Sequence, residues 1–146
     1  MGQVFDKAMD FKRRNRGGIV WNLKQHCEVV ERHLNPGEYV TFAFAGQKND
    51  KFYELFQTCV VVLTNKRILI GQKRVVWGYF LSSITPDLYN DLLVYQGLIW
   101  GQIKIDTVKE EVTISNLPKS GLDEIETNIS EMMMKEKQKY GHSEEN

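Results

Sequence analysis

Residues 60–71 limit the possible folds of this chain more than any other stretch. Two runs of aliphatic residues, Val60–Leu63 and Ile68–Ile70, flank the polar segment Thr64–Arg67. β-Branched side chains favour strands, and Thr and Asn side chains hydrogen-bond to nearby backbone groups in turns. The stretch therefore predicts two antiparallel strands joined by a tight turn.

Alternation of apolar and polar residues predicts further strands on both sides of this hairpin. In residues 38–46, for example, Val40, Phe42 and Phe44 would share one face of a strand. The connections are mostly short, which favours antiparallel neighbours. The predicted strands are 38–46, 55–63, 67–72, 75–82, 87–95, 98–106 and 110–116.

Helical periodicity is present at both ends of the chain. Residues 3–14 and 19–34 predict two helices, separated by Gly17 and Gly18. A third helix is predicted from Ser120, which would be its N-cap. Apolar residues spaced three and four apart form one stripe on the second helix and another on the third. The first stripe is Val20, Leu23, Cys27, Val30 and Leu34, and the second is Leu122, Ile125, Ile129 and Met132 or Met133.

This order of elements predicts a mainly β protein of the α+β class. A single run of antiparallel strands followed by an amphipathic helix favours a bent sheet or partly open barrel, with the helix closing its mouth. We expect residues 1–33 to form an N-terminal helical extension and residues 34–138 to form the barrel with its capping helix. Residues 139–146 are predicted to be a disordered tail.

Composition and local motifs indicate a protein without catalytic machinery. The formal net charge is zero, which disfavours nucleic acid as a partner. Cys27 and Cys59 lack metal-ligand spacing, and no phosphate loop, Gly-x-Ser-x-Gly or His-Glu-x-x-His pattern is present. His26 and His33 would lie about 10 Å apart along a helix, too far to share a metal. We expect no enzyme activity, no cofactor, no metal and no small-molecule substrate, with a small enzyme as the least favoured alternative.

The two cysteines and the apolar segments bear on location. Two buried, free thiols are typical of a reducing cytoplasm. No apolar run approaches the roughly 18 residues of a membrane-spanning helix, and the first residues lack the apolar core of a signal peptide. The expected location is therefore the cytoplasm.

The order of four short segments resembles the bacterial pleckstrin-homology-like domains and the related GRAM domains. These segments are 34–38, 63–68, 80–84 and 114–119. The resemblance implies a seven-stranded barrel closed by a C-terminal helix, and a module that binds or assembles, since bacterial members resemble oligomer-forming modules. Within the second segment, Thr64 and Asn65 can bond to nearby backbone, and Arg67 can reach a carboxylate or carbonyl groups. We expect a structural role for all three residues.

The preferred function is a non-catalytic assembly or protein-interaction module that forms homo-oligomers. Its interface would combine the stripe of the second helix with an open strand edge. The alternative is a peripheral membrane module that binds anionic lipid through Arg13, Arg14, Lys48 and Lys51, with Phe5 and Phe11 on a basic first helix. The Arg-bearing half of the inositol-phosphate pattern of eukaryotic relatives is missing near Lys48 and Lys51.

Two questions stay open at the level of sequence. The N-terminal helices can pack on their own barrel, pair between subunits, or lie on a membrane. Aromatic residues crowd the fourth to sixth strands, where core packing is the favoured interpretation for most and a protein-binding face is the alternative. These residues are Trp77, Tyr79, Tyr89, Tyr95 and Trp100.

Overall fold

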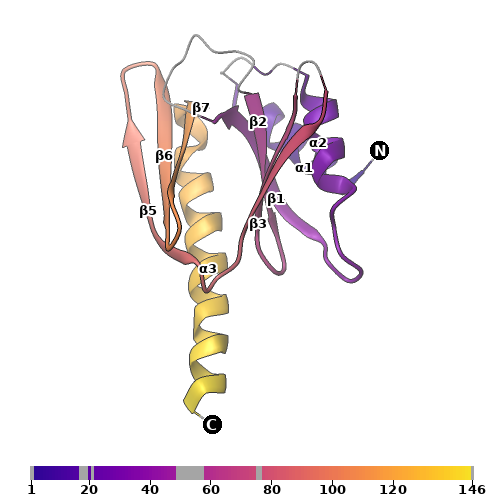
Figure 1. Cartoon of the computed structure of the whole chain (residues 1–146). Helices are drawn as coiled ribbons and strands as arrows, with labels where there is room; N and C mark the ends of the chain where they lie inside the picture. The colour runs from indigo at the N-terminus through magenta and orange to yellow at the C-terminus, as the bar shows by residue number, and fades with distance from the viewer. Residues whose placement is uncertain (1, 17–19, 21, 49–57, 75–76, 146) are drawn as a thin grey trace.

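The predicted hairpin forms the centre of a seven-stranded antiparallel sheet in the computed structural model (Figure 1). The structure describes residues 2–16, 20, 22–48, 58–74 and 77–145, with side chains as far as Lys135. The elements in chain order are α1 (Gln3–Arg14), α2 (Leu23–Glu31), β1 (Val40–Gln47), β2 (Thr58–Thr64), β3 (Ile68–Lys73), β4 (Tyr79–Ile84), β5 (Tyr89–Gln96), β6 (Trp100–Thr107), β7 (Glu111–Pro118), the 3-10 turn η2 (Lys119–Gly121) and α3 (Leu122–Glu145).

The strands are arranged in the order β4-β3-β2-β1-β7-β6-β5, and every neighbouring pair is antiparallel. β4 and β5 are therefore the two edges of the sheet. β1 and β7 are joined at one registered pair, Gln47 and Ser115, whereas the other neighbours share at least four. The sheet consequently consists of two sub-sheets, β4-β3-β2-β1 and β7-β6-β5, that curl toward each other. This confirms the predicted architecture of a partly open barrel.

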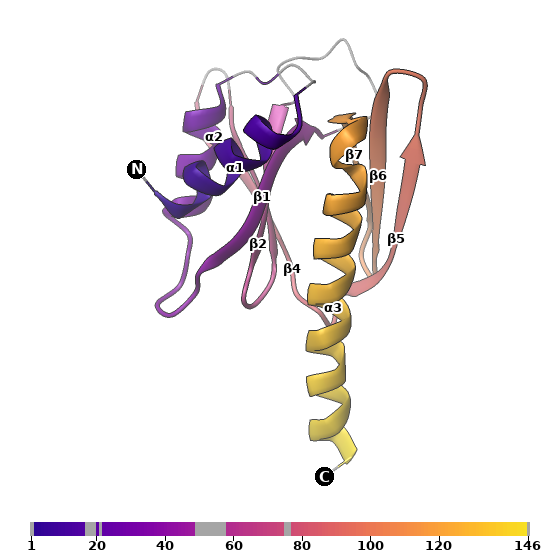
Figure 2. The same ribbon diagram turned by 180° about the vertical axis from the view of Figure 1, so that it is seen from behind.

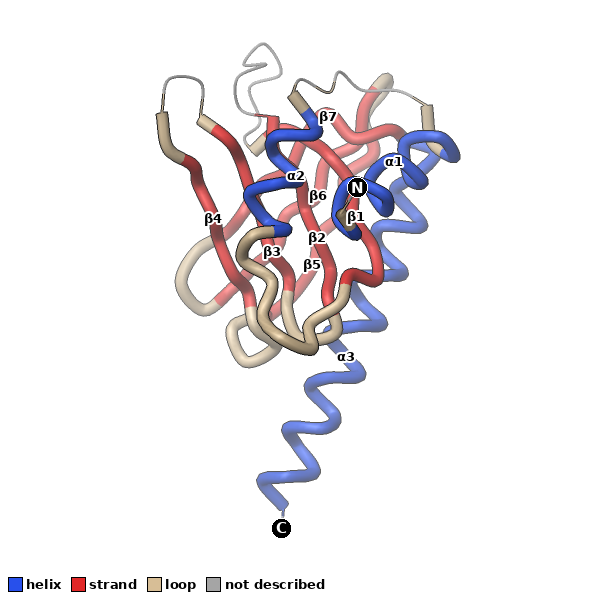
Figure 3. Tube along the Cα trace, turned by 90° about the vertical axis from the view of Figure 1, so that its right-hand side faces the viewer, coloured by secondary structure: helices blue, strands red, loops and turns tan. Residues whose placement is uncertain are grey.

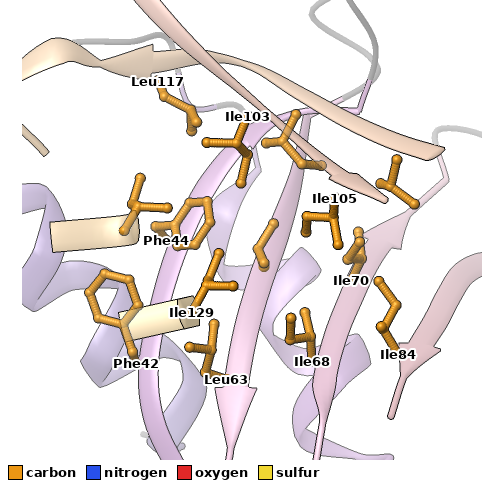
Figure 4. Packing of buried hydrophobic residues seen from close by; sticks show 14 of the residues in the cluster. Phe42, Phe44, Leu63, Ile68, Ile70, Ile84, Ile103, Ile105, Leu117 and Ile129 are labelled. Carbon is orange, nitrogen blue, oxygen red and sulfur yellow. The ribbon is translucent and has the colours of Figure 1, made fainter. Parts of the chain in front are cut away.

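The main core lies inside the curl, where side chains from both sub-sheets meet α3 (Figure 4). Phe42 and Phe44 of β1 point into this core, as alternation predicts, and share it with Ile103 and Ile105 of β6. On α3 the predicted stripe is confirmed, because Leu122, Ile125, Ile129 and Met133 are 0–3% exposed and Met132 is partly buried. α3 thus closes the open side of the sheet (Figure 2).

The two N-terminal helices pack on their own sheet, which is one of the three placements that the sequence allowed. α2 lies across β2 and β3 and α1 lies along β1 (Figure 3). A second core cluster joins them to the outer face of the sheet, and includes Val4, Ala8, Cys27, Val30, Ala43, Val60, Val62 and Leu69. The approach of α2 is close, since a Cβ on Gly71 would lie 2.4 Å from Cγ2 of Val30.

α1 also covers the part of the β1 edge that β7 leaves free. The backbone N–H of Val40 donates to Oε1 of Gln3 at 3.0 Å. Phe11, which the helical pattern places off the apolar face, enters the main core and packs edge-on against Phe42 with ring centroids 5.6 Å apart. An unpaired strand edge is a site of unwanted association, so α1 protects this one.

Several local predictions are corrected. α2 begins at Leu23 instead of residue 19, after Asn22 in the left-handed conformation. Ser120 does not cap α3, because it lies in η2 and its Oγ donates to Oδ1 of Asn15. A histidine on an amphipathic helix is commonly solvated or at an interface, but His26 is buried, and its Nδ1 accepts from the backbone N–H of Lys73 at 2.8 Å. α3 has helical backbone as far as Glu145.

Candidate interaction surfaces

Arg67 of the hairpin turn is held in a network that ties the turn to the start of β1. Its Nε and Nη2 donate to the two carboxylate oxygens of Glu38 at 2.9 and 3.0 Å. Nη2 also donates to the carbonyl of His33 at 3.1 Å, and Nη1 to Oγ of Ser83 at 3.2 Å. These contacts occupy four of the five N–H donors of the guanidinium, so the described contacts of Arg67 are structural.

Thr64 and Asn65 complete the same network. Oγ1 of Thr64 donates to Oε2 of Glu38 at 2.7 Å and accepts from the backbone N–H of Arg67. Oδ1 of Asn65 accepts from the backbone N–H of Tyr39 at 2.9 Å. The three motif residues therefore bond to backbone and to one buried carboxylate, which are the kinds of contact expected from the sequence.

Glu38 should make the stability of the protein depend on pH in the acid range. Burial alone would raise the pKa of Glu38, but hydrogen bonds from Arg67, the backbone of Asn35 and Thr64 outweigh it and lower this pKa to about 2. Because the pKa of Glu38 is lower in the folded state than the ordinary value of 4.5, its stabilisation is complete above pH 4.5 and is lost as the pH falls toward 2. We expect a loss of about 3 kcal/mol from this group, measured as the free energy of unfolding against pH. The variant Glu38→Gln should show a flatter curve, and parallel curves for the two proteins would refute this assignment.

The stripe predicted as a self-association surface is partly occupied by the chain itself. Cys27 and Val30 are 1% and 0% exposed, because they pack against the outer face of the sheet. Leu23 and Leu34 are half-buried against the same cluster, and Val20 is half-buried. This face of α2 is therefore not available to a second subunit while α2 stays on its own sheet.

The residues predicted to bind lipid have other contacts. Arg14 forms an ion pair with Glu124, and Arg13 lies 3.6 Å from the carboxylate of Asp10. Lys48 places its ammonium 3.2 Å from the centroid of the Phe80 ring, and burial lowers its pKa. Lys51 lies outside the described residues. In these contacts, Arg13 and Arg14 pair with carboxylates, and Lys48 lies over an aromatic ring.

Phe11 is likewise unavailable to a membrane, since it is 3% exposed in the main core. Phe5 of α1 is half-buried against the second core cluster and keeps part of its side chain accessible. No helix in the part of the chain that the structure describes combines the length and hydropathy of a membrane span.

Several large exposed apolar side chains lie at or next to the two edge strands of the sheet. Of the five aromatic residues considered in the sequence, only Tyr89 is buried, so the core interpretation is wrong for the other four. Trp77 is 79% exposed, and Tyr79 and Tyr95 are both 48% exposed. Leu93 of β5, at 41%, points to the same face as Tyr95 two residues on. Leu98 and Ile99 at the β5–β6 turn are also exposed.

β5 is the more accessible edge for a partner. It is eight residues long, and its regular pairing with β6 extends from Asp91 to Gln96. Leu92 and Val94 turn inward to the core, while Leu93 and Tyr95 face outward. Asp91 is its one charged residue, so this edge lacks the lysines and prolines that commonly protect such strands. Alternation in the sequence predicted that β5 has two different faces. Residue type alone did not show which of the two is exposed.

The described side chains do not assemble a metal centre. No group of three or more His, Cys, Asp or Glu residues comes close enough to hold an ion, within the ranges that the structure describes. Cys27 and Cys59 are free and buried, and burial raises the pKa of each thiol to about 12. Both thiols are therefore protonated at neutral pH and poor nucleophiles.

Known proteins were compared with this chain by sequence and by structure. A family model described as a bacterial PH domain matches residues 34–131. The structure is similar to a pleckstrin homology domain from Shewanella amazonensis SB2B, with a TM-score of 0.54 and 18% identity over 76% of this chain and 96% of that one. A DUF1696 family protein with a pleckstrin-homology domain from Shewanella loihica PV-4 has a TM-score of 0.49 and 16% identity, over 82% and 96% of the chains. The comparison with curated proteins finds no match.

Proposed function

Because the chain belongs to the bacterial PH domain family, we propose that it is a non-catalytic module of the cytoplasm that binds proteins, and that its partner is a second copy of itself. The observation that supports self-association is the free edge of β5, where Leu93 and Tyr95 are 41% and 48% exposed. Family membership supports a small binding module, and this edge supplies a surface. No cofactor takes part in the proposed association.

The proposed contact adds strand to strand. The outward N–H and C=O groups of an edge strand can pair with a strand from another chain. Two copies related by a two-fold axis would place their β5 strands antiparallel, so that each edge satisfies the other. Leu93 and Tyr95 would then pack against the same residues of the second copy, and cross-strand pairs of this kind stabilise a sheet.

Solution mass tests this proposal directly. Light scattering coupled to size exclusion should give the unsubstituted chain a mass of at least twice 17.0 kDa. Leu93→Lys should give the 17.0 kDa of a single chain, because two lysines would meet across the two-fold axis and an edge lysine blocks strand addition. Leu93 is exposed, so the substitution should leave the fold intact, which the far-UV circular dichroism spectrum checks.

Val108→Lys is the matched control. Val108 is 65% exposed in the β6–β7 turn, so this variant makes the same change of chemistry away from β5 and should keep the mass of the unsubstituted chain. A single-chain mass for the unsubstituted protein at every concentration would refute self-association. An unchanged mass for Leu93→Lys would refute the β5 edge as its surface.

A further inference from the structure

The first part of the β5 edge carries a hydrogen bond that competes with strand addition. Oδ1 of Asp91 accepts from the backbone N–H of Leu92 at 2.8 Å. In an antiparallel ladder, the backbone groups of every second residue bond to the neighbouring strand, and those between them point away from it. The one neighbour of β5 is β6. A Leu92 N–H that is held by a side chain is therefore one of the donors at the free edge, and Val94 and Gln96 follow at the same spacing.

A β-bulge lies immediately before Asp91. Tyr89 is opposite Thr107 and Asp91 is opposite Asp106, so Asn90 is an extra residue of β5 in this ladder. Bulges increase the local twist of a strand and are one of the features that limit pairing at the edges of sheets. The bulge and the Asp91 contact are adjacent, and both lie where β5 begins. The regular pairing of the second half of β5 has no such interruption.

The charges around Asp91 favour this position of its carboxylate. Asp106 is directly opposite Asp91 on β6, and Glu111 is directly opposite Asp106 on β7. Like charges that are opposite each other in a sheet are destabilising. The ammonium of Lys104 is 3.7 Å from the carboxylate of Glu111, and the ion pairs between described side chains do not include Asp91. The Leu92 N–H is thus a favourable donor for this carboxylate, because a charged acceptor forms a stronger hydrogen bond than a neutral one.

We propose that Asp91 limits the affinity of the β5 edge for a second copy of the chain, because it occupies a donor that strand pairing needs. This inference rests on the proposed self-association. With Leu93 at the two-fold axis, Leu92 of one copy is opposite Val94 of the other, and its N–H would donate to the carbonyl of that Val94. Asp91 must first release the Leu92 N–H, and this happens twice in a two-fold pair. The Asp91 contact is therefore a restraint on association that is built into the edge strand.

Asp91→Ala tests this restraint. It frees the Leu92 N–H in both copies, so the dissociation constant of the pair should fall at least about tenfold in sedimentation equilibrium. Asp91→Asn keeps an oxygen that can accept from the same N–H but carries no charge. Its dissociation constant should lie between those of Asp91→Ala and the unsubstituted chain. An Asp91→Asn constant as low as that of Asp91→Ala would assign the effect to charge alone and overturn the proposed role of the hydrogen bond.

Asp10→Ala is the matched control. The side chain of Asp10 is 50% exposed on α1, which packs on β1, so this variant makes the same change away from β5. It should leave the dissociation constant unchanged. An equal fall in Asp10→Ala and Asp91→Ala would show that the loss of one negative charge from the chain explains the result, and would overturn a specific role for Asp91.

Hydrogen exchange separates this inference from self-association. In dilute solution, where single chains predominate, the Leu92 amide should exchange faster in Asp91→Ala than in the unsubstituted chain, and the Val94 amide should exchange equally in both. Equal exchange of the Leu92 amide, or a dissociation constant that does not fall in Asp91→Ala, overturns the restraint and leaves self-association standing. Single-chain masses for both proteins at every concentration refute self-association itself, and the restraint with it.

Discussion

Replacing Arg67 with methionine is expected to lower the free energy of unfolding by about 3–5 kcal/mol. Glu38 has 1% of its side chain exposed, and Arg67 donates to both of its carboxylate oxygens. Removing the guanidinium leaves a buried carboxylate with one side-chain donor, Thr64, and the desolvation cost is no longer balanced. Urea denaturation at pH 7 measures the change.

Arg14→Met is the matched control for this prediction. It removes an arginine side chain from the ion pair with Glu124. In this pair the side chain of Arg14 is 52% exposed and that of Glu124 is 32% exposed. Exposed pairs contribute about 0–1 kcal/mol, so this variant should be close to the unsubstituted chain. Equal losses of unfolding free energy in Arg14→Met and Arg67→Met would show that the burial of Glu38 does not determine the cost of removing Arg67. The double variant Arg67→Met, Glu38→Leu should recover part of the loss, because it leaves no unpaired charge.

Phe11→Ala is expected to lower the free energy of unfolding by about 3–5 kcal/mol, as for other buried aromatic residues. Phe11 is 3% exposed and its ring packs against Phe42 and Phe44 at centroid distances of 5.6 and 5.9 Å. The substitution would leave a cavity where α1, β1 and η2 meet, since the ring also lies against Gly121. Urea denaturation followed by circular dichroism measures the loss.

Phe5→Ala is the comparison for Phe11→Ala. Phe5 lies on the same helix but is half-buried, at the margin of the second core cluster on the outer face of the sheet. We therefore expect a smaller loss of unfolding free energy. If Phe11→Ala costs no more than Phe5→Ala, α1 is not part of the domain core. A large loss would mean that the bacterial PH match at 34–131 omits a helix on which the stability of the domain depends.

Periodicity in the sequence predicted the strands and the stripe of α3. Inward residues such as Phe42 and Phe44 alternate with outward ones, and Ile125 and Ile129 recur at helical spacing, so burial could be inferred locally. Phe11 was not predicted, because a single helical stripe assumes one contact surface. α1 contacts two surfaces, since it lies over the free part of the β1 edge between the outer cluster and the main core.

Such patterns do not predict contacts between residues that are distant in sequence. Arg67 was expected to reach a carboxylate, but Glu38 is 29 positions away and no periodicity connects them. The position of Asp91 opposite Asp106 depends on the register of β5 and β6, which the sequence does not specify. The exposed state of Leu93 and Tyr95 follows from which face α3 covers, and so from the tertiary arrangement.

The single registered pair between β1 and β7 marks the boundary between the two halves of the domain. Backbone hydrogen bonding forms continuous ladders within each sub-sheet. Among the described residues, the two sub-sheets are joined at the single pair of Gln47 and Ser115. The angle between the sub-sheets therefore depends on side-chain packing in the shared core, which includes Ile125 and Ile129 of α3. Changes in the volume of these two residues would tilt one half of the domain against the other while leaving the ladders within each half intact.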